Sequence, residues 1–310
     1  MRENYNTLDI TKFIASIGVV AIHTPPLSHL SPNYLHTLIG FITSLCVPFF
    51  FVASSFLFFT HNREFSCVKL LHFIKRILLL YGGWFIIYLF ITRDFSLFYH
   101  PSFAKLFDSF YGSWFYIALV ISTVIVWNMT KINEYVSIIF GSIVYSYFVA
   151  CHCGWEYKFI YNLCNYYTNG WFLSFPYAII FSVIGFVICD KKHYLRKIGL
   201  MNCIVIILLL TTGTDIFKES VSWILRLMAV ETIVIVSIKI KCAYTYKSLR
   251  NMSVLIFMIH FYIYHIFIKN IPLSWMNLRY VIVLVITLIL SYVVLRVSRK
   301  ARFTFLKYLY

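Results

Sequence analysis

The chain has 310 residues, of which 61% are hydrophobic and only 12% are charged, and its formal net charge is +16. Soluble domains have about 45–50% apolar and about 25% charged residues, so this composition excludes a soluble protein and predicts a membrane protein. The positive charge does not predict a nucleic-acid partner, because the lysines and arginines lie in short connections between apolar runs. There they act as orientation and headgroup charges in the lipid bilayer.

Ten apolar runs have roughly the length of a membrane span, which needs about 20 mostly apolar residues. No repeat, low-complexity tract or linker separates them into groups. We therefore predict an all-α, polytopic membrane helix bundle with about ten transmembrane helices, forming a single domain over residues 1–310. The runs are residues 8–25, 37–60, 70–92, 113–130, 134–151, 171–189, 198–213, 220–239, 252–270 and 279–297.

The positive charges predict how this bundle is oriented. With an even number of spans both termini share one side, and the connections on that side carry most of the lysines and arginines. Positive charge accumulates on the cytoplasmic side of membrane proteins. We therefore expect both termini in the cytoplasm and a multi-pass protein of the plasma (inner) membrane.

The first run carries three ionisable residues, Asp9, Lys12 and His23. Lys12 and His23 are eleven residues apart, so at about 100° per residue they share one helix face and stand about 16 Å apart along the axis. Charged groups facing lipid are costly, so this face should look into the bundle or a wet cavity. Asp9 lies one turn before Lys12 and can pair with it.

Prolines should interrupt the first two runs. Pro25 and Pro26 end the first run, because proline removes a backbone donor and clashes with the preceding turn. Pro48 lies inside the second run and should kink it.

His23 is the leading candidate for a general base, since the unperturbed imidazole titrates near neutral pH. A histidine wetted by headgroup water is the alternative. In the late run 252–270, Ser253 and His260 recur at helical spacing and are candidates to support the same interior. His265 falls on another face and is interpreted as a packing or interfacial residue.

Two further groups of residues have both a functional and a structural interpretation. Arg226 and Glu231 lie inside the run 220–239 but about 140° apart around the helix, so each needs a partner elsewhere, such as the first or third helix. They mark either a functional site or an interhelical ion pair. Lys75 and Arg76 begin the third run, where they form either a positive-inside anchor or a phosphate clamp.

The cysteines around one loop predict no metal site. Cys151, His152 and Cys153 lack the usual two-to-four-residue spacing of zinc ligands. A disulfide involving Cys151, Cys153 or Cys164 remains open if the loop faces an oxidising compartment.

Several stretches together resemble the membrane acyltransferase 3 family, in the same order and spacing over nearly the whole chain. The first is L-D-x-x-[RK] followed by a histidine, here Leu8, Asp9, Lys12 and His23. The others are Val47–Leu57, Lys75-Arg76 with Tyr81, Ser113–Leu119, Asn169–Gly185, and Ser253 with His260. The chain departs from the family pattern where Lys12 replaces arginine, Ser55 and Ser174 replace glycines, and Ser113 replaces histidine.

The resemblance implies an acyltransferase that takes an acyl group, commonly acetyl, from cytoplasmic coenzyme A. The acceptor would be a hydroxyl or amine of a surface glycan or a lipid-linked saccharide. Under this hypothesis His23 is the general base and Arg226 stabilises the oxyanion. Lys12, Lys75 and Arg76 would bind coenzyme A, and the supporting residues would be Asp9, Glu231, Ser253 and His260.

Two other functions remain open at this stage. A multi-pass transporter of a small polar solute, such as an amino acid, would need the same polar track through the helices. A structural subunit of a polysaccharide export machine would need neither His23 nor Arg226. A homo-oligomer is compatible with any of the three functions.

Overall fold

The protein is described by a computed structural model that covers residues 5–26, 34–93, 99, 112–167, 174–190, 199, 202, 219–268 and 275–310. These residues form helices and short connections with no strand among them, which confirms the all-α class. The chain separates into two compact units. The terminal unit comprises Met1–Phe50 and Val236–Tyr310, and the central unit comprises Phe51–Ile235.

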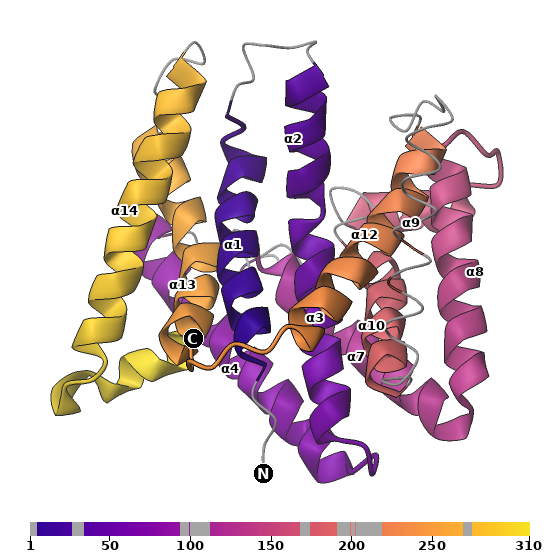
Figure 1. Cartoon of the computed structure of the whole chain (residues 1–310). Helices are drawn as coiled ribbons and strands as arrows, with labels where there is room; N and C mark the ends of the chain where they lie inside the picture. Colours follow the sequence, from indigo (N-terminus) through magenta and orange to yellow (C-terminus); the bar gives the residue numbers. More distant parts are fainter. Residues whose placement is uncertain are drawn as a thin grey trace. The chain divides into compact units, whose positions relative to one another are not determined.

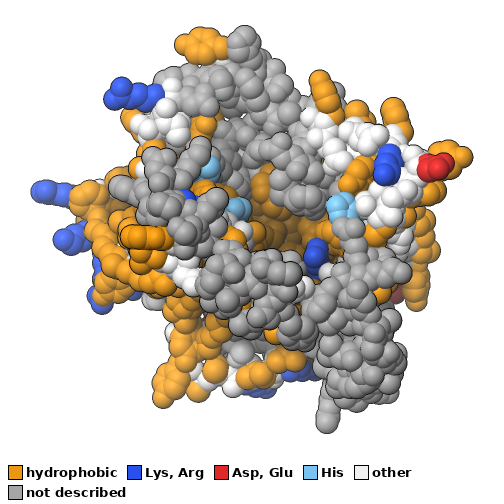
Figure 2. All heavy atoms as spheres, turned by 90° about the horizontal axis from the view of Figure 1, so that it is seen from above, with side chains coloured by type: hydrophobic (Ala, Val, Ile, Leu, Met, Phe, Trp, Pro, Cys, Tyr) orange, Lys and Arg blue, Asp and Glu red, His pale blue; other side chains and the backbone are white. Residues whose placement is uncertain are grey.

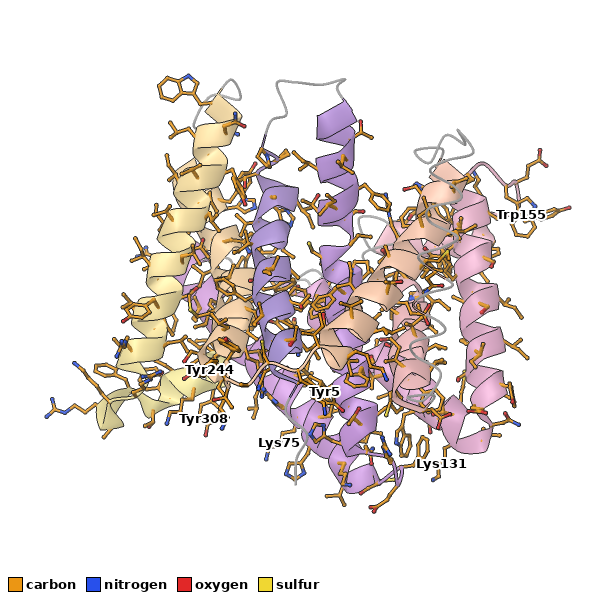
Figure 3. All side chains as sticks on the ribbon, in the orientation of Figure 1. Tyr5, Lys75, Lys131, Trp155, Tyr244 and Tyr308 are labelled. Atoms are coloured by element: carbon orange, nitrogen blue, oxygen red, sulfur yellow. The ribbon has the colours of Figure 1, made fainter. Side chains whose placement is uncertain are left out.

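The terminal unit is built around the first helix, which packs along α13; α13 in turn packs against α14 (Figure 1). Tyr5 and Tyr308, near the two chain ends, lie at the same end of this unit as Tyr244 (Figure 3). Its elements are α1 (Asn6–His23), α2 (Tyr34–Ser44), the start of α3 (Cys46–His61), the end of α12 (Glu219–Lys239), α13 (Lys247–Ile263), the π-helical η3 (Tyr264–Ile268), α14 (Met276–Val297) and the 3₁₀ segment η5 (Ala301–Leu309).

The central unit places α10 against both α7 and α8, which also pack against each other. Together with the remaining parts of α3 and α12, its elements are α4 (Cys67–Thr92), α7 (Trp114–Ile132), α8 (Glu134–His152), α9 (Phe159–Tyr167) and α10 (Phe175–Asp190). Lys75 and Lys131 lie at one end of this unit and Trp155 at the other (Figure 3).

A glycine allows α10 to approach α3 closely. A Cβ atom at Gly185 would come within 2.7 Å of the Val52 carbonyl oxygen and 2.8 Å of the Phe56 amide nitrogen, closer than real Cβ atoms approach such atoms. Beside this contact the Ser182 hydroxyl lies 3.1 Å from that of Ser55 and 2.9 Å from that of Ser122. The three buried hydroxyls therefore satisfy one another where α3, α7 and α10 meet.

Six helices within the described ranges are long and apolar enough to cross a membrane. They are Thr37–His61, Cys67–Thr92, Trp114–Ile132, Glu134–His152, Val221–Lys239 and Asn277–Val297. Each coincides with a predicted span. The predicted runs 8–25, 171–189 and 252–270 are helical over α1, α10 and α13 but fall outside this set, and the run 198–213 lies almost entirely outside the described residues.

The helix is interrupted near Pro48, where the sequence predicts a kink. The helix is interrupted at Leu45, between the end of α2 at Ser44 and the start of α3 at Cys46. Pro48 has no N–H to donate to the carbonyl of Ser44 four residues earlier, and its ring crowds that carbonyl. The break therefore falls where the proline removes the helical hydrogen bond.

The exposed surfaces of several helices are apolar, as expected for helices in contact with lipid. On α4 the exposed side chains include Leu71, Ile86 and Phe90, and on α14 they include Val281 and Ile289. Figure 2 shows hydrophobic side chains over much of the visible surface that the described residues form. The chain is therefore a membrane protein with several apolar helices.

Candidate functional site

One face of α1 is polar and buried, as its sequence spacing predicts. Asp9 is 2% exposed, Lys12 8% and Ser16 0%, while His23, the last residue of the helix, is half-buried. The residues follow one another at intervals of three, four and seven positions, so they form a single stripe along the helix. The polar stripe of α1 thus lies inside the protein rather than facing lipid.

Asp9 pairs with a residue that the sequence analysis did not select. Arg250 donates from Nε to Oδ1 of Asp9 at 2.8 Å and from Nη2 to Oδ2 at 2.6 Å, a two-pronged ion pair between α1 and α13. The local spacing predicts Lys12 as the partner of Asp9. Nothing local in the sequence links Asp9 with Arg250, because the two residues are 241 positions apart.

Further hydrogen bonds hold the first turns of α1 to the segment that leads from α12 into α13. Asn6 donates to the Cys242 carbonyl at 2.8 Å, Thr7 donates to the Ile240 carbonyl at 2.7 Å, and the hydroxyls of Thr11 and Ser237 are 2.8 Å apart. On α13 itself, the hydroxyl of Ser253 donates to the Arg250 carbonyl at 2.7 Å. Ser253 therefore belongs to the Asp9 end of the helix pair.

His23 and His260 come together further along the same helix pair. Their ring centroids are 5.4 Å apart, and both rings contact Phe261, at 4.3 Å from His23 and 4.2 Å from His260. His260 is fully buried and its Nδ1 lies 2.9 Å from the Ile256 carbonyl oxygen. The structure thus joins two of the predicted site residues from opposite ends of the sequence.

Arg226 and Glu231 have separate partners within the central unit, as their angular spacing predicts. The Arg226 guanidinium lies over the Trp223 ring at 4.3 Å, a cation–π contact within α12. Glu231 accepts a hydrogen bond of 2.8 Å from Asn202. For Glu231 the suggested partner on the first or third helix is wrong, since Asn202 belongs to the predicted run 198–213.

Lys75 and Arg76 are exposed on α4, in the third turn of a helix that begins at Cys67. Neither side chain forms a hydrogen bond or an ion pair with another of the described residues. The ammonium group of Lys75 and the guanidinium group of Arg76 are therefore accessible to an anionic ligand. Lys75 lies at the same end of the central unit as Lys131 (Figure 3). Their exposure fits both a headgroup anchor and a phosphate-binding pair.

A model of the family described as "Acyltransferase domain" matches residues 5–296. The chain belongs to the acyltransferase 3 family. It is also 33% identical over 259 aligned residues to a protein from Enterococcus faecalis named "Amino-acid racemase", a match that covers 74% of this chain and 35% of that protein. The chain thus corresponds to about a third of that relative's length. No solved structure matches the chain.

Membership of the acyltransferase 3 family gives the motif departures a structural context. Ser55, which stands where the family commonly has glycine, is fully buried and contacts Ser182 in the close packing of α3 against α10. Ser113 and Ser174 are also buried. These substitutions exchange one small residue for another except at Ser113, where the histidine of the family pattern is replaced.

The loop cysteines of this acyltransferase 3 chain are free thiols. Cys151, Cys153 and Cys164 form no disulfide, and the Cys151 thiol lies 3.4 Å from the Tyr157 carbonyl. Burial raises the pKa of the Cys164 thiol, which disfavours the reactive thiolate. Within the described part of the chain no three metal-ligating side chains are grouped.

Proposed function

We propose that this acyltransferase 3 protein transfers an acetyl group from cytoplasmic acetyl-coenzyme A to a hydroxyl or amine of a cell-surface glycan or lipid-linked saccharide. The observation that carries the proposal is the position of His23. It ends the buried polar stripe of α1, remains half-buried, and lies beside His260. The contacts of His23 with other described residues are ring contacts, and none of them is a hydrogen bond.

The proposed reaction uses His23 as the general base. His23 takes the proton from the acceptor as the acceptor oxygen or nitrogen forms a bond to the thioester carbonyl carbon. The carbon–sulfur bond then breaks, and the proton passes to the sulfur, which leaves as the coenzyme A thiol. Two further roles remain predictions: stabilisation of the oxyanion by Arg226 and binding of coenzyme A by Lys12.

We assign the coenzyme A phosphates to Lys75 and Arg76, because both are exposed and adjacent on α4. This assignment assumes a plasma-membrane protein with ten spans and cytoplasmic termini. In that topology Lys75 and Arg76 would lie on the cytoplasmic side, where coenzyme A occurs. Arginine and lysine form strong, charge-assisted hydrogen bonds with phosphate.

Calorimetric titration of the purified protein with acetyl-coenzyme A tests the donor site. We expect saturable binding that weakens at least tenfold in Lys75→Ala/Arg76→Ala, since hydrogen bonds to charged groups contribute about 1.5–3 kcal/mol each. The matched control is Arg299→Ala/Lys300→Ala, which removes two exposed neighbouring charges elsewhere and should leave affinity unchanged. Absence of binding by folded protein, or equal loss in both double variants, contradicts the assignment.

The base role has a separate test. His23→Gln should bind acetyl-coenzyme A as tightly as the wild type but fail to transfer a radiolabelled acetyl group to a membrane glycan fraction. Glutamine keeps the approximate size and hydrogen-bonding capacity of histidine without its basicity. Transfer at the wild-type rate in this variant would remove His23 from the mechanism.

A transporter of a small polar solute is the second candidate function, and the relative named "Amino-acid racemase" favours an amino acid as that solute. Under this proposal the buried polar stripe of α1 would line part of the route. Reconstituted vesicles should then accumulate radiolabelled alanine without any coenzyme A. Alanine uptake together with no acetyl-coenzyme A binding would support this function over acyl transfer.

A further inference from the structure

The hydrogen bonding of His260 determines which of its nitrogens is free. A backbone carbonyl can only accept a hydrogen bond, so the contact of 2.9 Å between Nδ1 and the Ile256 oxygen places the proton on Nδ1. In the neutral ring Nε2 then carries a lone pair and acts as an acceptor. A hydrogen bond that fixes the other ring nitrogen in this way is the usual means of orienting a functional histidine.

Nε2 of His260 is buried and has no hydrogen-bond partner among the residues that the structure describes. The side chain is 0% exposed, and its ring neighbours are Phe257, Phe261 and His23. Burying an acceptor without a donor costs about 1–3 kcal/mol, and leucine or phenylalanine would fill the position without that cost. The lone pair of His260 is therefore suited to a donor group that arrives from outside the helix pair.

His23 supplies a second available ring beside the first. The two centroids are 5.4 Å apart with an interplanar angle of 37°, and no hydrogen bond joins the rings. Directly after α13 the chain continues into the π-helical η3 (Tyr264–Ile268), and π-helical turns frequently occur at functional sites. The His23–His260 pair thus brings together two imidazole rings that can each accept a hydrogen bond. Both rings contact Phe261, and the π-helical segment follows directly after this helix.

We propose that His260 is a positioning residue that accepts a hydrogen bond from a second donor on the acceptor substrate, next to the group that reacts at His23. The inference rests on the proposed acyl transfer and adds a chemical requirement for the acceptor substrate. The acceptor carries two neighbouring donors, as in a vicinal diol or an amino alcohol. A lone hydroxyl would satisfy His23 and leave Nε2 of His260 without a partner.

Two probe ligands that differ by one hydroxyl test this requirement: cis-cyclohexane-1,2-diol and cyclohexanol. Protein containing isotope-labelled histidine is reconstituted in lipid nanodiscs, and the Nε2 resonance of His260 is assigned as the signal absent from His260→Gln. The diol should shift this resonance, and cyclohexanol should need about a tenfold higher concentration to bind, as expected for one lost hydrogen bond to a buried acceptor.

Two variants separate positioning from simple packing. The side-chain oxygen of His260→Gln can take the place of Nε2 as an acceptor, so this variant should retain the preference for the diol. His260→Leu should lose that preference while still binding acetyl-coenzyme A. In acetyl transfer the leucine variant should raise the KM for the acceptor more than it lowers kcat, and the glutamine variant should restore KM.

The inference fails if saturating diol leaves the His260 resonance unmoved in the wild type, a result that depends on His260→Gln only for the assignment of the signal. It also fails if His260→Leu discriminates between the two probes as the wild type does. Acetyl-coenzyme A titration of the same nanodiscs separates this failure from failure of the proposed function. Donor binding with no response at His260 overturns only the positioning role, whereas absence of donor binding overturns acyl transfer itself.

Discussion

The ion pair between Asp9 and Arg250 should be the strongest single polar contact between α1 and α13. It consists of two charge-assisted hydrogen bonds of 2.8 Å and 2.6 Å, each of which contributes about 1.5–3 kcal/mol before desolvation is counted. The Asp9 side chain is 3% exposed, so much of this gain offsets the loss of its hydration. The Arg250 side chain is 38% exposed, and solvent screening weakens the attraction further. We expect a coupling free energy of about 2 kcal/mol.

A double-mutant cycle measures this coupling. The free energy of unfolding of the wild type, Asp9→Asn, Arg250→Gln and the double variant is obtained by titrating detergent-solubilised protein with sodium dodecyl sulfate. Each substitution should cost more stability in the wild type than in the protein that already carries the other substitution. The reason is that either substitution alone leaves one unpaired charge. The charge-exchanged variant Asp9→Arg/Arg250→Asp should recover part of the loss.

The exposed pair Glu64 and Lys69 provides a matched control. Its charged atoms are 3.7 Å apart and the side chains are 84% and 48% exposed, so its coupling should lie within about 0.5 kcal/mol of zero. A cycle through Glu64→Gln and Lys69→Gln uses the same assay. If the Asp9–Arg250 coupling is no larger than this control, the two-pronged pair does not hold α1 against α13 and our reasoning is wrong.

Three further predictions concern the central unit, and thermal unfolding in detergent checks each of them. Gly185→Ala should destabilise the protein by about 1–3 kcal/mol through overpacking, whereas Gly40→Ala, where nothing lies within 4 Å of the new Cβ, should be neutral or slightly stabilising. Ser182→Ala should cost about 1–2 kcal/mol because it leaves two buried hydroxyls without their shared partner. Glu231→Gln should retain the hydrogen bond from Asn202 and most of the stability, whereas Glu231→Leu should lose this hydrogen bond and be less stable.

The prediction of an all-α membrane protein succeeded because it depends only on local periodicity and length. A run of about 20 apolar residues has few alternatives in a membrane, since every backbone group must form its hydrogen bond inside a helix. The same periodicity placed Asp9, Lys12 and His23 on one face of α1, and that face is buried as far as Lys12 and Ser16. Family membership was also predictable, because the order and spacing of the motifs are properties of the sequence alone.

The partners of those residues were decided by tertiary structure. Local spacing favoured Lys12 as the partner of Asp9, but α1 packs along α13 and brings Arg250 to the carboxylate. His23 meets His260 for the same reason. Helical periodicity states which face of a helix is polar, but not which other helix that face meets. The sequence by itself therefore determined the helices and their polar faces, and only the packing of α1 on α13 produced the ion pair and the histidine pair.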